Sequence, residues 1–209
     1  MPSDLVLLVA DKNIEHGVRD LLGRPQALGI RALTSKIYVH PQRDAACAQK
    51  PHEFLRQFSR DYDRALVVFD HQGCGMENRI PVDIEASVRH LLSANGWDGR
   101  RADAVVIAPE LEAWVFSTSP QVEICLAWPS PLPLRQWLEE HGLWLQQDQK
   151  PADPKSALEK ALAKLRRPRS SAIYESLAAA VDFGECQDPA FNRFKAVLQN
   201  WFPLTGNSA

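Results

Sequence analysis

The chain has 209 residues, of which 45% are hydrophobic and 24% are charged. This composition is ordinary for a globular protein with a sizeable core, and it gives no reason to expect intrinsic disorder. The formal net charge of -2 excludes a global basic field for non-specific binding to nucleic acid, so such binding would need a local basic patch.

The cysteines are widely spaced and form no C-x-x-C pair; they stand at positions 47, 74, 125 and 186. This spacing argues against a structural zinc site and against a disulfide framework, and it favours a reducing compartment. The first ten residues lack a positively charged segment, and no apolar run approaches the length of a membrane span. We therefore expect a cytoplasmic protein without a membrane partner.

The first predicted strand covers residues 5–10 and is followed by Asp11. Apolar residues then recur at helical spacing up to residue 22, and Asn13 would cap this helix. Glu15 falls in the first turn, where an acid opposes the helix dipole favourably. Glu15 is therefore either a structural residue or part of a site.

The next elements are one or two short strands within residues 30–40 and an amphipathic helix over residues 51–62. They lead to residues 65–69, an unbroken apolar run that predicts a strand buried on both faces. Asp70 ends this run and a glycine-containing loop follows. Because the carboxyl end of a parallel strand faces the ligand crevice, Asp70 is either a site residue or the cap of the following turn.

A helix over residues 82–92 and a buried strand over residues 104–108 continue the alternation. Pro109 follows the strand and suits a helix start, where Glu110 and Glu112 are favourable electrostatically. Strand and helix in this rhythm predict an α/β fold with a mostly parallel sheet flanked by helices. Asp11, Asp70 and one of the two glutamates would then meet at one edge of the sheet.

Beyond residue 119 the predicted elements are helices, joined by a proline-rich connector over residues 128–133. We interpret residues 1–119 as the α/β domain and residues 120–209 as a helical extension packed on the same core. The basic run at 164–169 suits either a solvated helix end or a phosphate-binding patch.

Converging carboxylates favour a hard divalent cation, and Mg²⁺ is the natural one because it prefers oxygen ligands. The implied chemistry is phosphoryl transfer, in which a metal orients a phosphate and stabilises its charge. The chain has no phosphate-binding loop of the G-x-x-x-x-G-K-[ST] type, no H-E-x-x-H and no G-x-S-x-G motif. A Cys74 nucleophile assisted by His71 is the weaker alternative, since nothing completes a triad.

Several short motifs, taken in order, resemble the TOPRIM-like proteins of prokaryotic defence loci. They are the first strand with its acid, the Asp-x-x-Gly at 70–73, the Pro-Glu-Leu-Glu-Ala-Trp at 109–114, Lys150 with Asp153-Pro154-Lys155, and the Asp-Pro-Ala-Phe at 188–191. These proteins include relatives of the overcoming-lysogenization-defect nucleases. The chain is also similar to the small TOPRIM-like component of methylation-associated phage-defence systems.

The resemblance implies a set of site residues. Asp11 would fill the position of the family's first-strand glutamate, Glu15 that of the acid in the following helix, and Asp70 that of the first acid of an Asp-x-Asp pair. Glu112 matches the acid of a Glu-x-Trp motif, whereas Glu110 has no counterpart. The second acid of the pair is replaced by Gln72, whose amide oxygen carries no charge.

Two functions follow as expectations. In the first, the chain is a Mg²⁺-dependent nuclease or phosphoryl-transfer enzyme of phage defence. Asp70, Glu112 and Asp11 would then bind the metal, Asp11 or Glu15 would act as acid or base, and Lys150 or Lys155 would contact phosphate. In the second, the chain is a non-catalytic subunit that binds other defence-system proteins. A nucleotide-binding regulator is a third, weaker interpretation.

Overall fold

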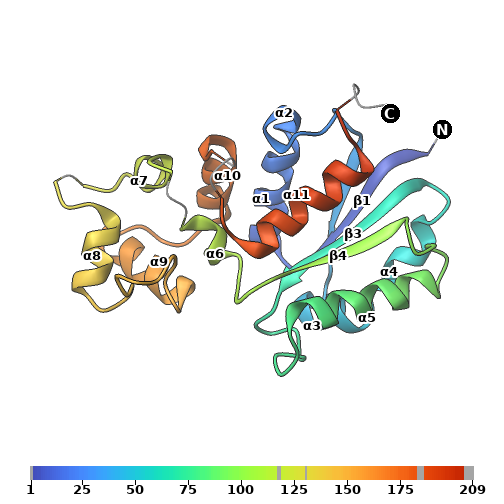
Figure 1. Cartoon of the computed structure of the whole chain (residues 1–209), viewed down its shortest axis with the longest axis horizontal. Helices are drawn as coiled ribbons and strands as arrows, with labels where there is room; N and C mark the ends of the chain where they lie inside the picture. Colours follow the sequence, from blue (N-terminus) through green and yellow to red (C-terminus); the bar gives the residue numbers. More distant parts are fainter. Residues whose placement is uncertain (1, 117–118, 130, 183–185, 205–209) are drawn as a thin grey trace.

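A computed structural model describes residues 2–116, 119–129, 131–182 and 186–204. Its centre is a sheet of four parallel strands in the order β2-β1-β3-β4 (Figure 1). The strands are β1 (Ser3–Val9), β2 (Ser35–Val39), β3 (Tyr62–Asp70) and β4 (Ala102–Ile107). The prediction of an α/β fold with a parallel sheet is therefore confirmed, and every pairing in this sheet is parallel.

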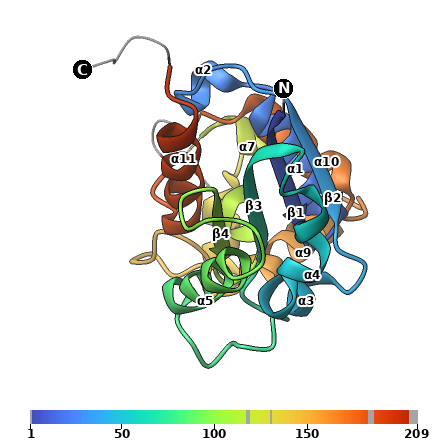
Figure 2. The same ribbon diagram turned by 90° about the vertical axis from the view of Figure 1, so that its right-hand side faces the viewer.

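Helices cover both faces of the sheet (Figure 2). On one face lie α3 (Arg43–Gln49), α4 (Pro51–Leu55) and α5 (Pro81–Ser93); on the other lie α1 (Lys12–Leu22) and α11 (Pro189–Trp201). The short helix α2 (Pro25–Leu28) follows α1. This cover explains the unbroken apolar runs, because Leu5–Val9 and Ala65–Phe69 are fully buried.

Three element boundaries differ from those expected from the sequence. The side chain of Asp11, rather than that of Asn13, caps α1 by accepting the N–H of Ile14 at 2.9 Å. Strand β2 begins only at Ser35. The helix expected up to residue 62 divides into α4 and a 3₁₀ turn, η1 (Arg56–Phe58), because β3 already begins at Tyr62.

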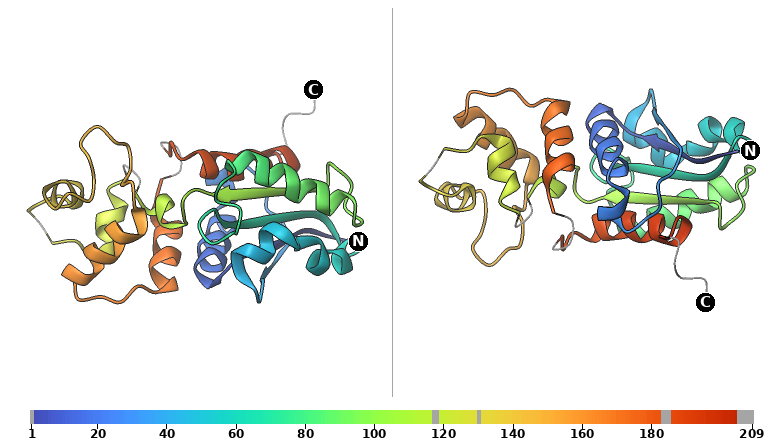
Figure 3. Two further views of the ribbon diagram at one scale, coloured as in Figure 1. Left: turned by 90° about the horizontal axis from the view of Figure 1, so that it is seen from below. Right: turned by 90° about the horizontal axis from the view of Figure 1, so that it is seen from above.

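The remaining helices lie beyond the carboxyl edge of the sheet. They are α6 (Glu112–Val115), α7 (Gln121–Leu126), α8 (Leu134–Glu140), α9 (Pro154–Lys164) and α10 (Ser171–Ala180). Seen from below and from above (Figure 3), α7, α8 and α9 form the end of the molecule farthest from the chain termini. Helix α10 lies between them and the sheet and packs on α1. Ser130, in the predicted connector, lies outside the described residues.

The free edge of β4 is closed by side-chain carboxylates. Backbone N–H groups of successive residues in a strand point to opposite sides. Arg101 and Ile107 accept hydrogen bonds from Ala65 and His71, so the N–H groups of the even-numbered Ala104 and Val106 point away from β3. Asp103 Oδ1 accepts the N–H of Ala104 at 2.8 Å, and Glu85 Oε1 accepts that of Val106 at 3.1 Å. Arg193 of α11 lies 2.6 Å from Asp103 and 3.5 Å from Glu85, and so compensates both charges.

Within the described ranges, no helix combines the length and the apolarity needed to cross a membrane.

Candidate functional site

Three carboxylates meet where β3 and β4 end. One oxygen each of Asp70, Glu110 and Glu112 lies within 4.8 Å of the others. Asp70 is the last residue of β3. Both glutamates follow β4, Glu110 before α6 and Glu112 as its first residue. The strand order changes direction between β1 and β3, so Asp70 at the carboxyl end of β3 borders the place where open parallel sheets bind ligands.

Asp70 has the least compensated charge of this acidic group. Its Oδ1 is buried and has no hydrogen-bond partner among the described residues. Burial raises the pKa of Asp70 well above its usual range, and the charges of Asp44, Glu112, Asp11 and Glu110 raise it further. An unpaired buried carboxylate oxygen is costly, so this position favours either a proton or a cation.

Glu112 is held by two residues from the far part of the chain. Its Oε1 accepts hydrogen bonds from Arg169 Nη1 at 2.5 Å and from the hydroxyl of Tyr174 at 2.6 Å. Burial, and then the nearby Glu112, raise the pKa of the Tyr174 hydroxyl, which keeps it a donor. Glu112 is 3% exposed, so these partners are what allow its charge to be buried.

Glu110 has a cation of its own. Lys155 Nζ lies 2.7 Å from Glu110 Oε2, and this hydrogen bond raises the pKa of Lys155. Residues two apart in a helix do not share a face, so two glutamates at this spacing on one helix need not reach the same metal. Both reach Asp70 because α6 begins only at Glu112, so Glu110 precedes the helix and is free of its periodicity.

Asp44 is a further carboxylate beside the acidic group, and we did not predict it from the sequence. Its Oδ1 accepts the backbone N–H of Asp70 at 2.9 Å, and burial raises its pKa. Asp44 lies in the first turn of α3, five residues after β2 ends at Val39. The available signal was therefore an acid shortly after a strand, the same signal that marked Asp11 and Asp70.

Two other predicted site residues, Asp11 and Glu15, have local partners on α1. Asp11 caps α1, and its charge acts on Asp70, but it lies outside the group of three carboxylates. Glu15 forms ion pairs with Lys12 and Arg19 on the same helix. Of the two predicted phosphate-binding lysines, Lys155 is thus at the acidic group, whereas Lys150 is engaged elsewhere.

Lys150 belongs to a second buried ion pair. Its Nζ lies 2.7 Å from Asp188 Oδ2 and 2.5 Å from the carbonyl of Ala113. The other oxygen of Asp188 accepts the indole N–H of Trp114 at 3.0 Å and the N–H of Phe191 at 2.9 Å, which caps α11. These contacts tie α6, which carries Glu112, to the start of α11.

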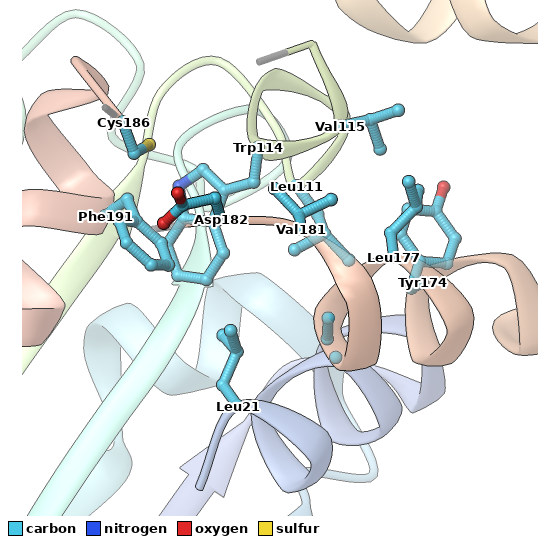
Figure 4. A pocket seen from close by; sticks show the side chains of 12 residues that line it. Leu21, Leu111, Trp114, Val115, Tyr174, Leu177, Val181, Asp182, Cys186 and Phe191 are labelled. Atoms are coloured by element: carbon cyan, nitrogen blue, oxygen red, sulfur yellow. The ribbon is translucent and has the colours of Figure 1, made fainter. Parts of the chain in front are cut away.

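A small apolar cavity of about 50 Å³ lies behind α6 (Figure 4). Leu111, Val115, Leu177 and Val181 are among its lining residues, and Tyr174 lines it with its ring. The hydroxyl of Tyr174 leaves the cavity to reach Glu112. Tyr174 therefore both lines the cavity and binds a member of the acidic group.

The donor set of the acidic group suits a hard divalent cation. Carboxylate oxygens are the ligands that Mg²⁺ and Ca²⁺ prefer, and the buried Asp70 Oδ1 is an oxygen without another partner among the described residues. Gln72, the residue at the second acid position of the resemblance, is exposed in the following loop. Glu110 instead supplies the additional carboxylate beside Asp70.

Comparison of the chain with models of protein families, with curated proteins and with solved structures finds no match.

Proposed function

We propose that this chain is a metal-dependent phosphoryl-transfer enzyme that acts on phosphodiester bonds of nucleic acid, with Mg²⁺ at the acidic group. The proposal rests on Asp70, which has a buried Oδ1 without a hydrogen-bond partner among the described residues and a carboxylate within 4.8 Å of those of Glu110 and Glu112. The resemblance to TOPRIM-like defence proteins supports nucleic acid as the substrate and phage defence as the setting, together with other proteins of such a system.

In this proposal Asp70, Glu110 and Glu112 hold the metal, which when bound neutralises phosphate charge and activates an oxygen nucleophile. The chain's own cations have a second role. Lys155 and Arg169 are 38% and 32% exposed in their side chains, so each can turn from its glutamate toward an incoming phosphate. Arg169 presents a planar fork that matches phosphate oxygens, whereas Lys155 supplies a point charge.

The same contacts also favour a second candidate function. Glu110 and Glu112 already have cationic partners, so the acidic group could serve to join the helical extension to the sheet. In that case the chain is a non-catalytic subunit that binds other proteins. This candidate function predicts that the protein binds no divalent cation at Asp70.

Calorimetric titration with Mg²⁺ and Mn²⁺ tests the proposal directly. We expect one saturable site in the native chain and its loss in Asp70→Asn. Asp61→Asn is the matched control, because Asp61 is exposed and precedes the opposite end of the same strand. Metal-dependent cleavage of single- and double-stranded DNA and RNA is then measured for the same proteins. Absence of cation binding by the native chain, or cleavage that Asp70→Asn leaves intact, would overturn the proposal.

A further inference from the structure

In the loop between β3 and α5, the carboxylate of Glu77 is bound by backbone N–H groups of the same loop. Glu77 Oε1 accepts the backbone N–H of Gly73 at 2.8 Å and that of Gly75 at 3.1 Å. We call these two N–H groups, with the space that the Glu77 carboxylate fills, the glycine cradle. Converging backbone N–H groups of this kind form anion-binding concavities in proteins.

The conformation of the cradle depends on its glycines. Gly73 and Gly75 have φ values of +89° and +76°, which residues with a side chain rarely adopt. A Cβ atom on Gly75 would also lie 2.9 Å from the side-chain nitrogen of Gln49. The sequence thus keeps two glycines where the backbone must turn its N–H groups toward one point.

Hydrogen bonds attach the loop of the cradle to the edge of the sheet that carries the acidic group. The N–H groups of His71 and Gln72 donate to the carbonyls of Ile107 and Pro109 at 2.8 and 3.0 Å. At the other end of the loop, His71 Nε2 donates to the carbonyl of Arg79 at 2.8 Å. The position of a Cβ atom on Gly73 lies 3.9 Å from Asp44 Oδ2, and Asp44 in turn binds the backbone of Asp70.

Glu77 is a replaceable occupant. Its side chain is exposed, so its carboxylate can return to water without opening the core. Hydrogen bonds from the backbone N–H groups of Glu77 itself, Gly75 and Gly73 lower its pKa, and the charge of His71 does so to a lesser extent. Glu77 therefore stays ionised near neutral pH, and a second anion, rather than a proton, is what can displace it.

We propose that the glycine cradle is a binding subsite for a phosphate group, and that Glu77 occupies it until a phosphate takes its place. The assignment of this phosphate to a nucleic-acid substrate rests on the proposed function. The cradle begins three residues after Asp70, and a Cβ atom on Gly73 would lie 3.9 Å from Asp44 Oδ2, so a phosphate there lies close to the carboxylates around Asp70. A cation bound at that group would reduce the repulsion between the phosphate and the carboxylates.

Amide NMR with inorganic phosphate tests the subsite in Glu77→Ala, with and without Mg²⁺. We expect saturable shifts of the Gly73 and Gly75 N–H signals. The native chain should bind about tenfold more weakly if Glu77 fills the cradle about nine-tenths of the time. Glu77→Gln, which keeps an acceptor oxygen without the charge, should lie between them. Asp83→Ala is the control, because it removes an exposed acid from the adjoining first turn of α5 and leaves the cradle filled.

A second arm replaces inorganic phosphate by a thymidine dinucleotide with one internal phosphodiester. Shifts with both probes support a subsite for internal phosphates, and shifts with inorganic phosphate alone assign the subsite to terminal phosphates. If neither probe shifts these signals in folded Glu77→Ala, or if Asp83→Ala gains as much affinity, the inference is overturned. Separate metal titration distinguishes this failure from failure of the proposed function, because the two readouts lie at different residues.

Discussion

Arg169 reaches Glu112 across 57 residues of sequence and places its guanidinium 2.5 Å from the glutamate oxygen. Glu112 stands at the end of the sheet, whereas Arg169 precedes α10. Since Glu112 is buried, the pair joins the two parts of the chain through a charge that needs its partner.

Replacement of Arg169 should lower the free energy of unfolding, and Mg²⁺ should restore part of the loss. Arg169→Gln leaves the buried charge of Glu112 with Tyr174 alone. We expect a loss of about 1–2 kcal/mol in the free energy of unfolding, below the value for a fully buried pair because Arg169 is 32% exposed. Urea denaturation with and without Mg²⁺ measures it. Arg166→Gln, at an exposed arginine nearby, should change little. A loss that Mg²⁺ does not reduce would contradict a shared role for the cation and Arg169.

Asp70→Asn should stabilise the protein at neutral pH. The pKa of Asp70 in the folded chain lies above its unfolded value of about 3.9, so ionisation opposes folding as pH rises through the folded-state pKa. The variant should therefore be more stable than the native chain near about pH 7.5, and the difference should vanish below about pH 4.

Thermal unfolding across this pH range measures the effect of Asp70→Asn. Mg²⁺ should raise the melting temperature of the native chain and leave that of the variant unchanged, because only the native chain gains a ligand. An equal gain in the variant would show that the cation binds elsewhere.

Lys150→Met should act on stability rather than directly on phosphate binding. The substitution leaves Asp188, which is 4% exposed, without its cation, and we expect a loss of about 2–4 kcal/mol. Chemical denaturation checks this value against Lys160→Met, which alters an exposed lysine of α9. Full stability combined with weaker nucleic-acid binding would instead support the substrate role expected from the sequence.

Glu85→Ala should open the free edge of β4. The N–H of Val106 would lose its acceptor, which costs about 1–3 kcal/mol, and the uncovered edge could pair with another chain. Sedimentation at several protein concentrations should reveal association of the variant. Glu85→Gln keeps an acceptor oxygen and should remain monodisperse to the same degree as the native chain. If both variants associate equally, charge rather than the hydrogen bond protects the edge.

Strands β1, β3 and β4 were predictable because each contains a continuous apolar run, which the partly exposed β2 lacks. Leu5–Val9 and Ala65–Phe69 are buried on both faces, so no other placement satisfies them. Asp70 was predictable for the same reason, since an acid directly after such a strand must lie at its carboxyl edge.

The partners of the acids were not predictable from local pattern. Lys155 and Arg169 lie 45 and 57 residues from the glutamates that they bind, and no periodicity links such positions. Asp44 carried the weaker form of the signal that marked Asp70, because it follows β2 by five residues instead of ending the strand. Both Glu110 and Glu112 reach Asp70 because α6 begins at Glu112. The exact start of a helix is difficult to predict from sequence.

The origin of the cations gives the acidic edge a role in assembly of the fold. The acids come from the sheet and the segment that follows β4. Their cationic partners, Lys155 and Arg169, lie much later in the sequence. The early part therefore has an excess of negative charge at one edge until the late part docks on it. Docking of the late segments is then driven by electrostatic attraction as well as by burial of apolar surface. Dissolved salt should slow this docking, because it screens the exposed charges before they come into contact.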